Sequence, residues 1–207
     1  MYFNRKCKIT FISHGATIYS EEGRFSDVLD YPPLSELGVE EMQNVVKYLK
    51  SRAIKNDAIY TSSSLRTLQS AAMISKLFKH DYEICENLTT RKYGDWNGLT
   101  YNQIMDKYPG ALLDMINKPD EKTQGNGESS AEFIKRTSEV INELVERNIG
   151  NRIIIVTHPE VIQASICSAL EIGADKLSKI FIRTGSITQI SYFESWSSLV
   201  YSDHVPL

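Results

Sequence analysis

Residues 8–15 read KITFISHG, a short apolar run that ends at Ser13 and is followed directly by His14 and Gly15. A second run, RIIIVTH at residues 152–158, also ends in a histidine, His158. Apolar runs of this length without strict alternation are typical of central parallel strands that helices cover on both faces. Ligands in open α/β sheets bind at the carboxyl ends of the strands, so we expect both histidines at one ligand-binding edge.

The rest of the chain alternates strand-like and helix-like patterns. We expect two further strands over residues 57–62 and 82–85, and helices over residues 35–50, 64–78, 101–108, 130–146 and 159–170. Residues 186–193 and 197–202 alternate like an antiparallel pair. The sequence therefore predicts an α/β fold with three layers, α/β/α, and a mostly parallel sheet that has an antiparallel C-terminal edge. Residues 15–33 and 109–127 are expected to be irregular, as binding loops or ordinary connections.

The composition of the 207 residues is close to the globular average, with 42% hydrophobic and 24% charged residues. A collagen-like, coiled-coil or disulfide-rich protein is therefore excluded, and residues 1–207 are expected to form one domain. The net charge of -3 supplies no broad positive field for nucleic acid. A local pocket for one small anion remains open, since two or three cations suffice for it.

The apolar runs fall short of the roughly 18 residues that cross a bilayer, so no membrane partner is expected. No secretion signal is visible in the first residues. Cys7, Cys85 and Cys167 are isolated and lack CxxC spacing, so we expect neither disulfides nor a zinc site. We expect a cytoplasmic protein whose reduced cysteines pack as small hydrophobic residues.

Arg66 is a third candidate for the ligand-binding edge, because it follows the strand expected at residues 57–62 and begins a helix. The free amides and the dipole of a helix N-terminus, joined by a guanidinium, favour a phosphate or carboxylate. Taken singly, each of these residues is more often structural or solvated. The three together predict an anion site.

The order and spacing of these residues and several others match one family along nearly the whole chain. The chain resembles the histidine phosphatase superfamily, also called the phosphoglycerate mutase-like family. The matching segments are residues 13–15 with Thr17, 23–24, 33–38, 62–71, 93–100, 127–129, 157–158, 186–188 and 203–204.

The resemblance implies a phosphoglycerate mutase-like fold and a small phosphorylated or anionic substrate. It assigns His14 as the nucleophile that becomes a phosphohistidine, with Arg66 and His158 holding the phosphoryl oxygens. A carboxylic acid would protonate the leaving group. The family requires no metal or other cofactor, and its members are commonly dimers, which leaves a homodimer open here.

The sequence departs from the family at two catalytic positions. Ser13 stands where the family has its first phosphate-binding arginine, and Thr90 stands where it usually has the acid. In addition, Ala16 and Ser20 replace a glutamate and an asparagine. Loss of one transition-state donor costs about a hundredfold to a thousandfold, and loss of a general acid roughly a hundredfold to ten-thousandfold. Efficient mutase activity is therefore not expected.

Residues elsewhere could compensate for these losses. Arg24 could bring a guanidinium to the anion, and Glu160 and Glu128 are candidate replacement acids. The alternative is that both glutamates only stabilise first helical turns through the helix dipole. The candidate catalytic residues are thus His14, His158, Glu160 and Glu128, and the candidate phosphate-binding residues are Arg66, Arg24, Ser13, Gly15 and Ser20.

Two kinds of function follow from this site. The first is a divergent histidine phosphatase that acts on a small phosphorylated metabolite through His14. The alternative is an impaired or repurposed member, which binds an anionic ligand or a partner protein, or carries out non-phosphoryl acid/base chemistry in a biosynthetic pathway.

Overall fold

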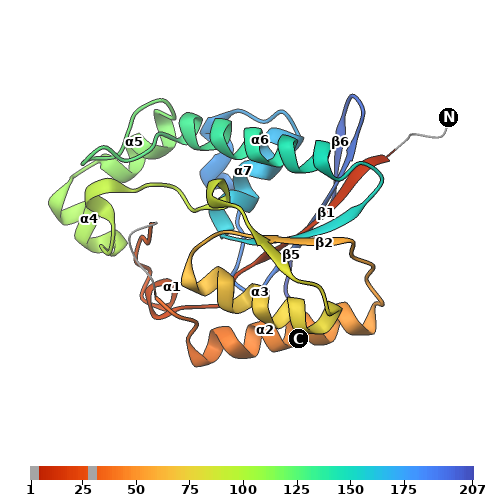
Figure 1. The fold of residues 1–207 in the computed structure, drawn as a ribbon. Helices are drawn as coiled ribbons and strands as arrows, with labels where there is room; N and C mark the ends of the chain where they lie inside the picture. Colours follow the sequence, from red (N-terminus) through yellow and green to blue (C-terminus); the bar gives the residue numbers. More distant parts are fainter. Residues whose placement is uncertain (1–4, 28–31) are drawn as a thin grey trace.

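The structure is a computed structural model that describes residues 5–27 and 32–207. A six-stranded sheet runs through its centre in the order β3-β2-β4-β1-β5-β6 (Figure 1). The strands are β1 (Arg5–Ser13), β2 (Ala58–Thr61), β3 (Tyr82–Ile84), β4 (Arg152–Thr157), β5 (Ile187–Phe193) and β6 (Ser197–His204). The first four are parallel, and β5 and β6 are antiparallel. The predicted mostly parallel sheet with an antiparallel C-terminal edge is therefore confirmed.

Helices cover both faces of the sheet, as predicted. The α-helices are α1 (Ile18–Glu21), α2 (Glu36–Ser51), α3 (Leu65–Phe78), α4 (Tyr101–Lys107), α5 (Ala111–Asn117), α6 (Ser130–Arg147) and α7 (Pro159–Ala169). Short 3₁₀ helices are η1 (Glu86–Leu88), η2 (Gly94–Trp96) and η3 (Ala174–Lys179). Figure 1 shows α2 and α3 on one face, α6 and α7 on the other, and α1, α4 and α5 at one end of the molecule.

Each face of the sheet has its own hydrophobic core. Phe11 and Phe133 belong to the core under α6 and α7, and Ile12 and Met42 belong to the core under α2 and α3. Successive strand residues point to opposite faces, so β1 supplies both cores. This two-sided burial is the reason that the strands read as continuous apolar runs.

Both segments that were expected to be irregular contain a short helix, so this part of the prediction was wrong. In residues 15–33, the Thr17 hydroxyl accepts from the Ser20 amide at 3.2 Å and begins α1. In residues 109–127, α5 follows Gly110, which has a φ of +84°. The four residues of α1 are too few for a helical period to show. Residues 28–31 of the first segment lie outside the described residues.

Two further findings concern the expectations on membranes and cysteines. Within residues 5–27 and 32–207, no helix is long and apolar enough to span a bilayer. Cys7 and Cys167 are fully buried, whereas Cys85 is partly buried at the edge of a core.

Candidate active site

Two adjacent parallel strands place the two histidines side by side. The register of β1 and β4 ends with Ser13 opposite Thr157, so His14 and His158 follow at the same edge. The His14 amide donates to the Thr157 carbonyl at 2.9 Å. The imidazole centroids lie 5.2 Å apart, and both side chains are buried. The tertiary structure thus brings together the two residues that the strand pattern placed at one edge.

His14 is held as a neutral imidazole with one free nitrogen. Its Nδ1 lies 2.8 Å from the Gly15 carbonyl oxygen, which only accepts, so Nδ1 carries the proton. Burial, and then the positive charge of Arg66, lower the pKa of His14 to about 3. Nε2 therefore keeps its lone pair at neutral pH, which is what a nucleophile requires.

A chain of hydroxyl groups orients His158. Its Nε2 lies 2.8 Å from the Ser62 hydroxyl, which lies 2.8 Å from the Thr67 hydroxyl. The Thr67 hydroxyl donates to the Ser64 carbonyl at 2.7 Å, so the Ser62 hydroxyl donates to Thr67 and accepts from His158. Burial, followed by the charges of Arg66, His14 and Arg136, lowers the pKa of His158 well below its usual value. Its buried Nδ1 has no partner among the described residues and is the ring atom left for a ligand.

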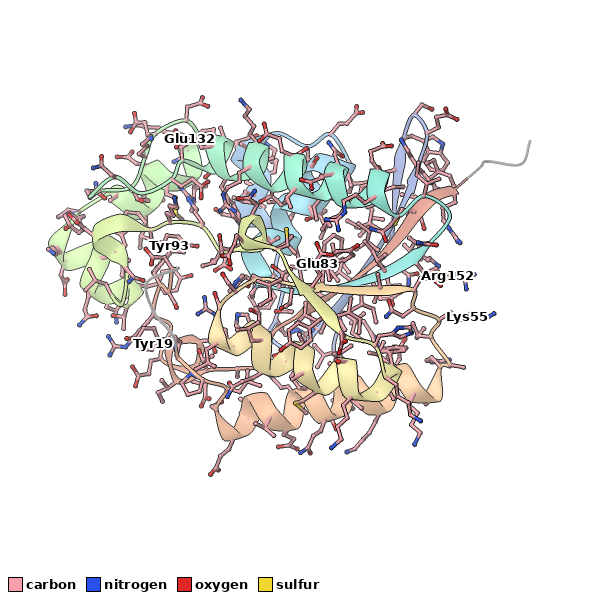
Figure 2. All side chains as sticks on the ribbon, in the orientation of Figure 1. Tyr19, Lys55, Glu83, Tyr93, Glu132 and Arg152 are labelled. Atoms are coloured by element: carbon pink, nitrogen blue, oxygen red, sulfur yellow. The ribbon has the colours of Figure 1, made fainter. Side chains whose placement is uncertain are left out.

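Both histidines line one small pocket of about 70 Å³. Two arginines, Arg24 and Arg66, and one carboxylate, Glu160, also line it. The remaining lining residues are Thr17, Tyr19, Ser20, Ser26, Thr90, Pro159 and Thr184. Figure 2 shows Tyr19 and Tyr93 at this end of the molecule, near α1 and α4.

The two arginines reach the pocket from different elements. Arg66 is buried in the first turn of α3, as the sequence predicted for a residue directly after β2. Arg24 comes from the loop after α1, where its Nη1 donates to the Gly98 carbonyl at 2.8 Å and its Nε to the Glu22 carboxylate. Ser13, by contrast, is buried outside the pocket lining, and its hydroxyl has no partner among the described residues. Arg24 therefore supplies a second guanidinium that the short Ser13 side chain lacks.

Glu160 occupies the neighbourhood of the missing acid. The hydroxyl of Thr90 donates to Glu160 Oε2 at 3.3 Å, and the hydroxyl of Tyr93 donates to Oε1 at 3.4 Å. Burial and the nearby Glu160 raise the pKa of Tyr93 well above its usual value, so its hydroxyl stays protonated and donates. The residue that stands at the position of the usual acid thus binds a carboxylate from α7.

Glu128 lies elsewhere, and the structure does not bring it into the pocket. Arg136 binds both of its oxygens, with Nε 2.9 Å from Oε1 and Nη2 3.0 Å from Oε2. Arg136 also donates to the carbonyls of Asn87, Thr89 and Thr90. Glu128 is therefore not among the residues that line the histidine pocket; its ion pair stays at the start of α6, and the carbonyl contacts of Arg136 join α6 to residues 87–90.

Gly15 and Ser20 have local structural tasks. A Cβ on Gly15 would lie 2.2 Å from the Gly38 carbonyl oxygen, so the loop after β1 can approach α2 only with glycine there. The Ser20 hydroxyl accepts from the Thr17 amide at 2.8 Å and donates to the Thr17 carbonyl at 2.9 Å. Ser20 lines the pocket, whereas Gly15 shapes it from outside the lining.

Five lining residues were not predicted as members of the pocket: Thr17, Tyr19, Ser26, Pro159 and Thr184. The capping pattern of Thr17 and Ser20 could have indicated a helix at this loop. Tyr19 lies in the short helix α1, and Ser26 and Thr184 lie in loops; none of the three carries a local signal of its own. Among the residues that the structure describes, no group of three or more His, Cys, Asp or Glu could hold a metal ion.

The fold and the site define a class of α/β proteins in which two histidines meet at the carboxyl edge of the sheet. Comparison with known families makes this specific: residues 9–203 match the histidine phosphatase superfamily (branch 1). The chain belongs to this superfamily.

Individual relatives are distant but similar over most of their length. Phosphoserine phosphatase 1 of Hydrogenobacter thermophilus is 24% identical over 169 residues, covering 82% of this chain and 79% of the relative. Phosphoglycerate mutase-like protein 4 of Arabidopsis thaliana is 27% identical over 198 residues, covering 95% and 85%. Among solved structures, Bacillus stearothermophilus YhfR superposes with a TM-score of 0.87 at 26% identity, covering 96% of this chain and 98% of that one.

Proposed function

We propose that the protein hydrolyses a small phosphomonoester through a phosphohistidine at His14. The observation that carries the proposal is the pocket itself, where a neutral imidazole with a free Nε2 stands beside two guanidiniums and one carboxylate. Relatives named as phosphatases support the same class of reaction.

In the first step, His14 Nε2 attacks phosphorus, and the bond between phosphorus and the ester oxygen breaks. Glu160, in its protonated form, gives its proton to the departing oxygen, which leaves as an alcohol. Arg24 and Arg66 stabilise the charge on the three remaining phosphoryl oxygens, and His158 joins them when its Nδ1 carries a proton. In the second step, water attacks phosphorus, the Glu160 carboxylate accepts its proton, and His14 is released with inorganic phosphate.

Glu160 suits this role because the pocket holds its side chain in place. The Thr90 and Tyr93 hydroxyls bind one oxygen each, so the carboxyl group is oriented before a substrate arrives. The lost acid at Thr90 is then replaced from α7 rather than from its own segment.

The decisive experiment traps the intermediate. The protein is incubated with an aryl phosphate and with a panel of sugar and acid phosphates, and acid-labile phosphohistidine and released phosphate are measured. We expect His14→Ala to abolish both, whereas His80→Ala, which alters an exposed histidine, leaves both unchanged. Turnover that persists unchanged in His14→Ala contradicts the proposal.

The loss of an arginine at Ser13 favours a second candidate, a pocket that binds an anion without turnover. Thermal melting with inorganic phosphate, citrate and sugar phosphates separates the two candidates. Stabilisation of the wild type without phosphate release or phosphohistidine supports binding alone, and phosphate release that depends on His14 excludes it.

A further inference from the structure

A second cavity lies at the other end of the sheet, outside the proposed active site. Its volume is about 290 Å³, and it is lined by Lys8, Thr10, Lys55, Arg152 and Gln189 together with the chain that follows α2. Figure 2 shows Lys55 and Arg152 near each other at the end of the molecule opposite Tyr19 and Tyr93. We call this the basic cavity.

The strand register explains how these polar residues gather on a face that is otherwise apolar. Lys8 pairs with Arg152 across β1 and β4, and Thr10 pairs with Gln189 across β1 and β5. Lys8 and Thr10 point to the same face as Ile12, which packs in the core under α2 and α3. Because α2 ends at Ser51, the sheet beyond it is no longer covered by that helix.

The cavity contains positive charge without a matching carboxylate. Within the described ranges, the side chains of Lys8, Lys55 and Arg152 form no ion pair, whereas other cations such as Lys6 and Arg147 do. Asp57 is the acidic residue that follows Lys55 two positions later. Its carboxylate accepts a hydrogen bond from the Arg152 main-chain amide at 2.8 Å and forms no ion pair with the Arg152 side chain within the described residues. Burial, and then the charges of Arg5 and Arg152, lower the pKa of Lys8.

The floor of the cavity is built from two buried polar side chains. Thr10 is 5% exposed and Gln189 is 7% exposed, and the Gln189 amide donates to the Thr10 hydroxyl at 3.1 Å. Buried polar groups cost free energy unless they are hydrogen-bonded, and Thr10 and Gln189 satisfy one another in this way. Polar groups in this place are suited to a polar ligand.

We propose that the basic cavity binds the phosphate group of a small phosphorylated metabolite at a site separate from the His14 pocket. The planar guanidinium of Arg152 matches two phosphate oxygens, and Lys8 and Lys55 supply point charges. The cavity leaves room for a compact organic group beside the phosphate. A second anion site of this kind makes the protein responsive to a metabolite that need not be its substrate.

The test separates the two anion sites by mutation. Binding of inorganic phosphate, pyrophosphate and phosphoserine is measured by titration calorimetry in a low-salt buffer, with an Arg24→Gln/Arg66→Gln variant that disables the His14 pocket. We expect this variant to retain one binding event. Adding Lys55→Gln/Arg152→Gln is expected to weaken that event by about tenfold or more for each cation removed. Adding Lys47→Gln/Lys135→Gln, which removes two exposed charges elsewhere, should leave it unchanged.

A measurement on the wild-type chain does not depend on whether the variants fold. Pyrophosphate should shift the amide resonances of residues 53–57 and Gln189 in addition to those of residues 14–20. Tighter binding of phosphoserine than of inorganic phosphate identifies a metabolite as the ligand, and the reverse identifies free phosphate.

Two outcomes overturn the proposal. One is the absence of any amide shift at residues 53–57 and Gln189 when the anions are added. The other is a Lys55→Gln/Arg152→Gln variant that melts at a lower temperature but binds anions as before. In that case the two cations of the wild type only stabilise the fold, by interacting with the carbonyls at the end of α2. Both outcomes are independent of turnover at His14.

Discussion

At the scale of single residues, Glu160 reaches the histidine pocket from the first turn of α7, and two hydroxyls bind its carboxylate. Arg24 reaches the same pocket from a loop far away in the sequence. The two residues have separable tasks in the proposed reaction. Glu160 moves a proton, whereas Arg24 stabilises charge on phosphoryl oxygens.

The variant Glu160→Gln keeps the shape of the side chain but removes its proton. We expect kcat/KM, which reports the first step alone, to fall about a hundredfold to ten-thousandfold for an alkyl phosphate and much less for an aryl phosphate, because a phenolate leaves without help from an acid. Steady-state kinetics with the two esters measure the difference. Glu128→Gln, outside the pocket, should affect both esters equally; an equal loss for both esters in Glu160→Gln would contradict the assignment.

The variant Arg24→Ala removes one of the two guanidiniums that line the pocket. We expect kcat/KM to fall about a hundredfold to a thousandfold, the usual cost of losing a donor to the transition state. Arg24→Lys should recover only part of this loss, because a lysine cannot bind two oxygens in one plane. The exposed Arg52→Ala serves as the control, and kinetics of Arg24→Ala that match this control would exclude Arg24 from the reaction.

At the scale of elements, the pocket depends on close contact between the loop after β1 and the start of α2. A Cβ on Gly38 would lie 2.0 Å from the Ala16 carbonyl oxygen, so the backbones touch directly. The Ala16 amide also donates to the Glu41 carboxylate of α2 at 2.7 Å. The helix therefore holds the loop that carries His14.

Gly38→Ala tests this contact, because helix propensity and packing predict opposite signs. Propensity alone would stabilise the protein by about 1 kcal/mol, since alanine is the better helix former. The clash with the Ala16 carbonyl should instead destabilise it by about 2 kcal/mol and reduce activity, because overpacking forces the backbone apart. Urea unfolding measures the free energy, with Gln43→Ala at an exposed position of α2 as the control. An increase in stability for Gly38→Ala would show that the contact is loose.

At the scale of the whole molecule, folding buries two histidines in one pocket in their neutral forms. The pKa of His14 falls from an ordinary value near 6.5 to about 3, and that of His158 falls well below its ordinary value. Between pH 6.5 and about 3, His14 of the unfolded chain binds a proton that His14 of the folded protein does not. The stability of the fold is therefore linked to pH through the same burial that keeps His14 nucleophilic.

The sign of this linkage gives a prediction. Above pH 6.5 the histidines are neutral in both states, and between pH 6.5 and about 3 only the unfolded chain takes up the His14 proton, so stability falls with falling pH. We expect a contribution of about 1.4 kcal/mol per pH unit from His14 in this window. Urea unfolding between pH 7 and pH 4 should show a smaller slope for His14→Gln than for the wild type. Equal slopes would mean that His14 titrates alike in both states.

Assembly and location also belong to the whole molecule. The cytoplasmic location expected from the sequence stays a prediction, and the family resemblance leaves a homodimer open. Sedimentation of the purified protein gives the oligomeric state directly.

The sequence by itself predicted the strands, the long helices and half of the residues that line the pocket. The runs before His14 and His158 are apolar because both faces of β1 and β4 are buried, so their strands, their parallel direction and their shared edge follow from local pattern. Arg66 was predicted at the same edge because it follows the apolar strand β2 and begins a helix. The short helices α1 and α5 were missed because few residues define them.

Only the tertiary structure showed that Glu160, unlike Glu128, lines the histidine pocket and that Arg24 lines it too. Both glutamates precede or begin helices, and the sequence treats them alike, but Arg136 binds Glu128 while Thr90 and Tyr93 bind Glu160. The basic cavity likewise depends on tertiary structure. The strand register places Lys8 beside Arg152 at the start of β1 and β4, where α2 has ended and no longer covers the sheet. Such choices depend on contacts between segments far apart in the chain, whereas periodicity reports only on what each segment buries locally.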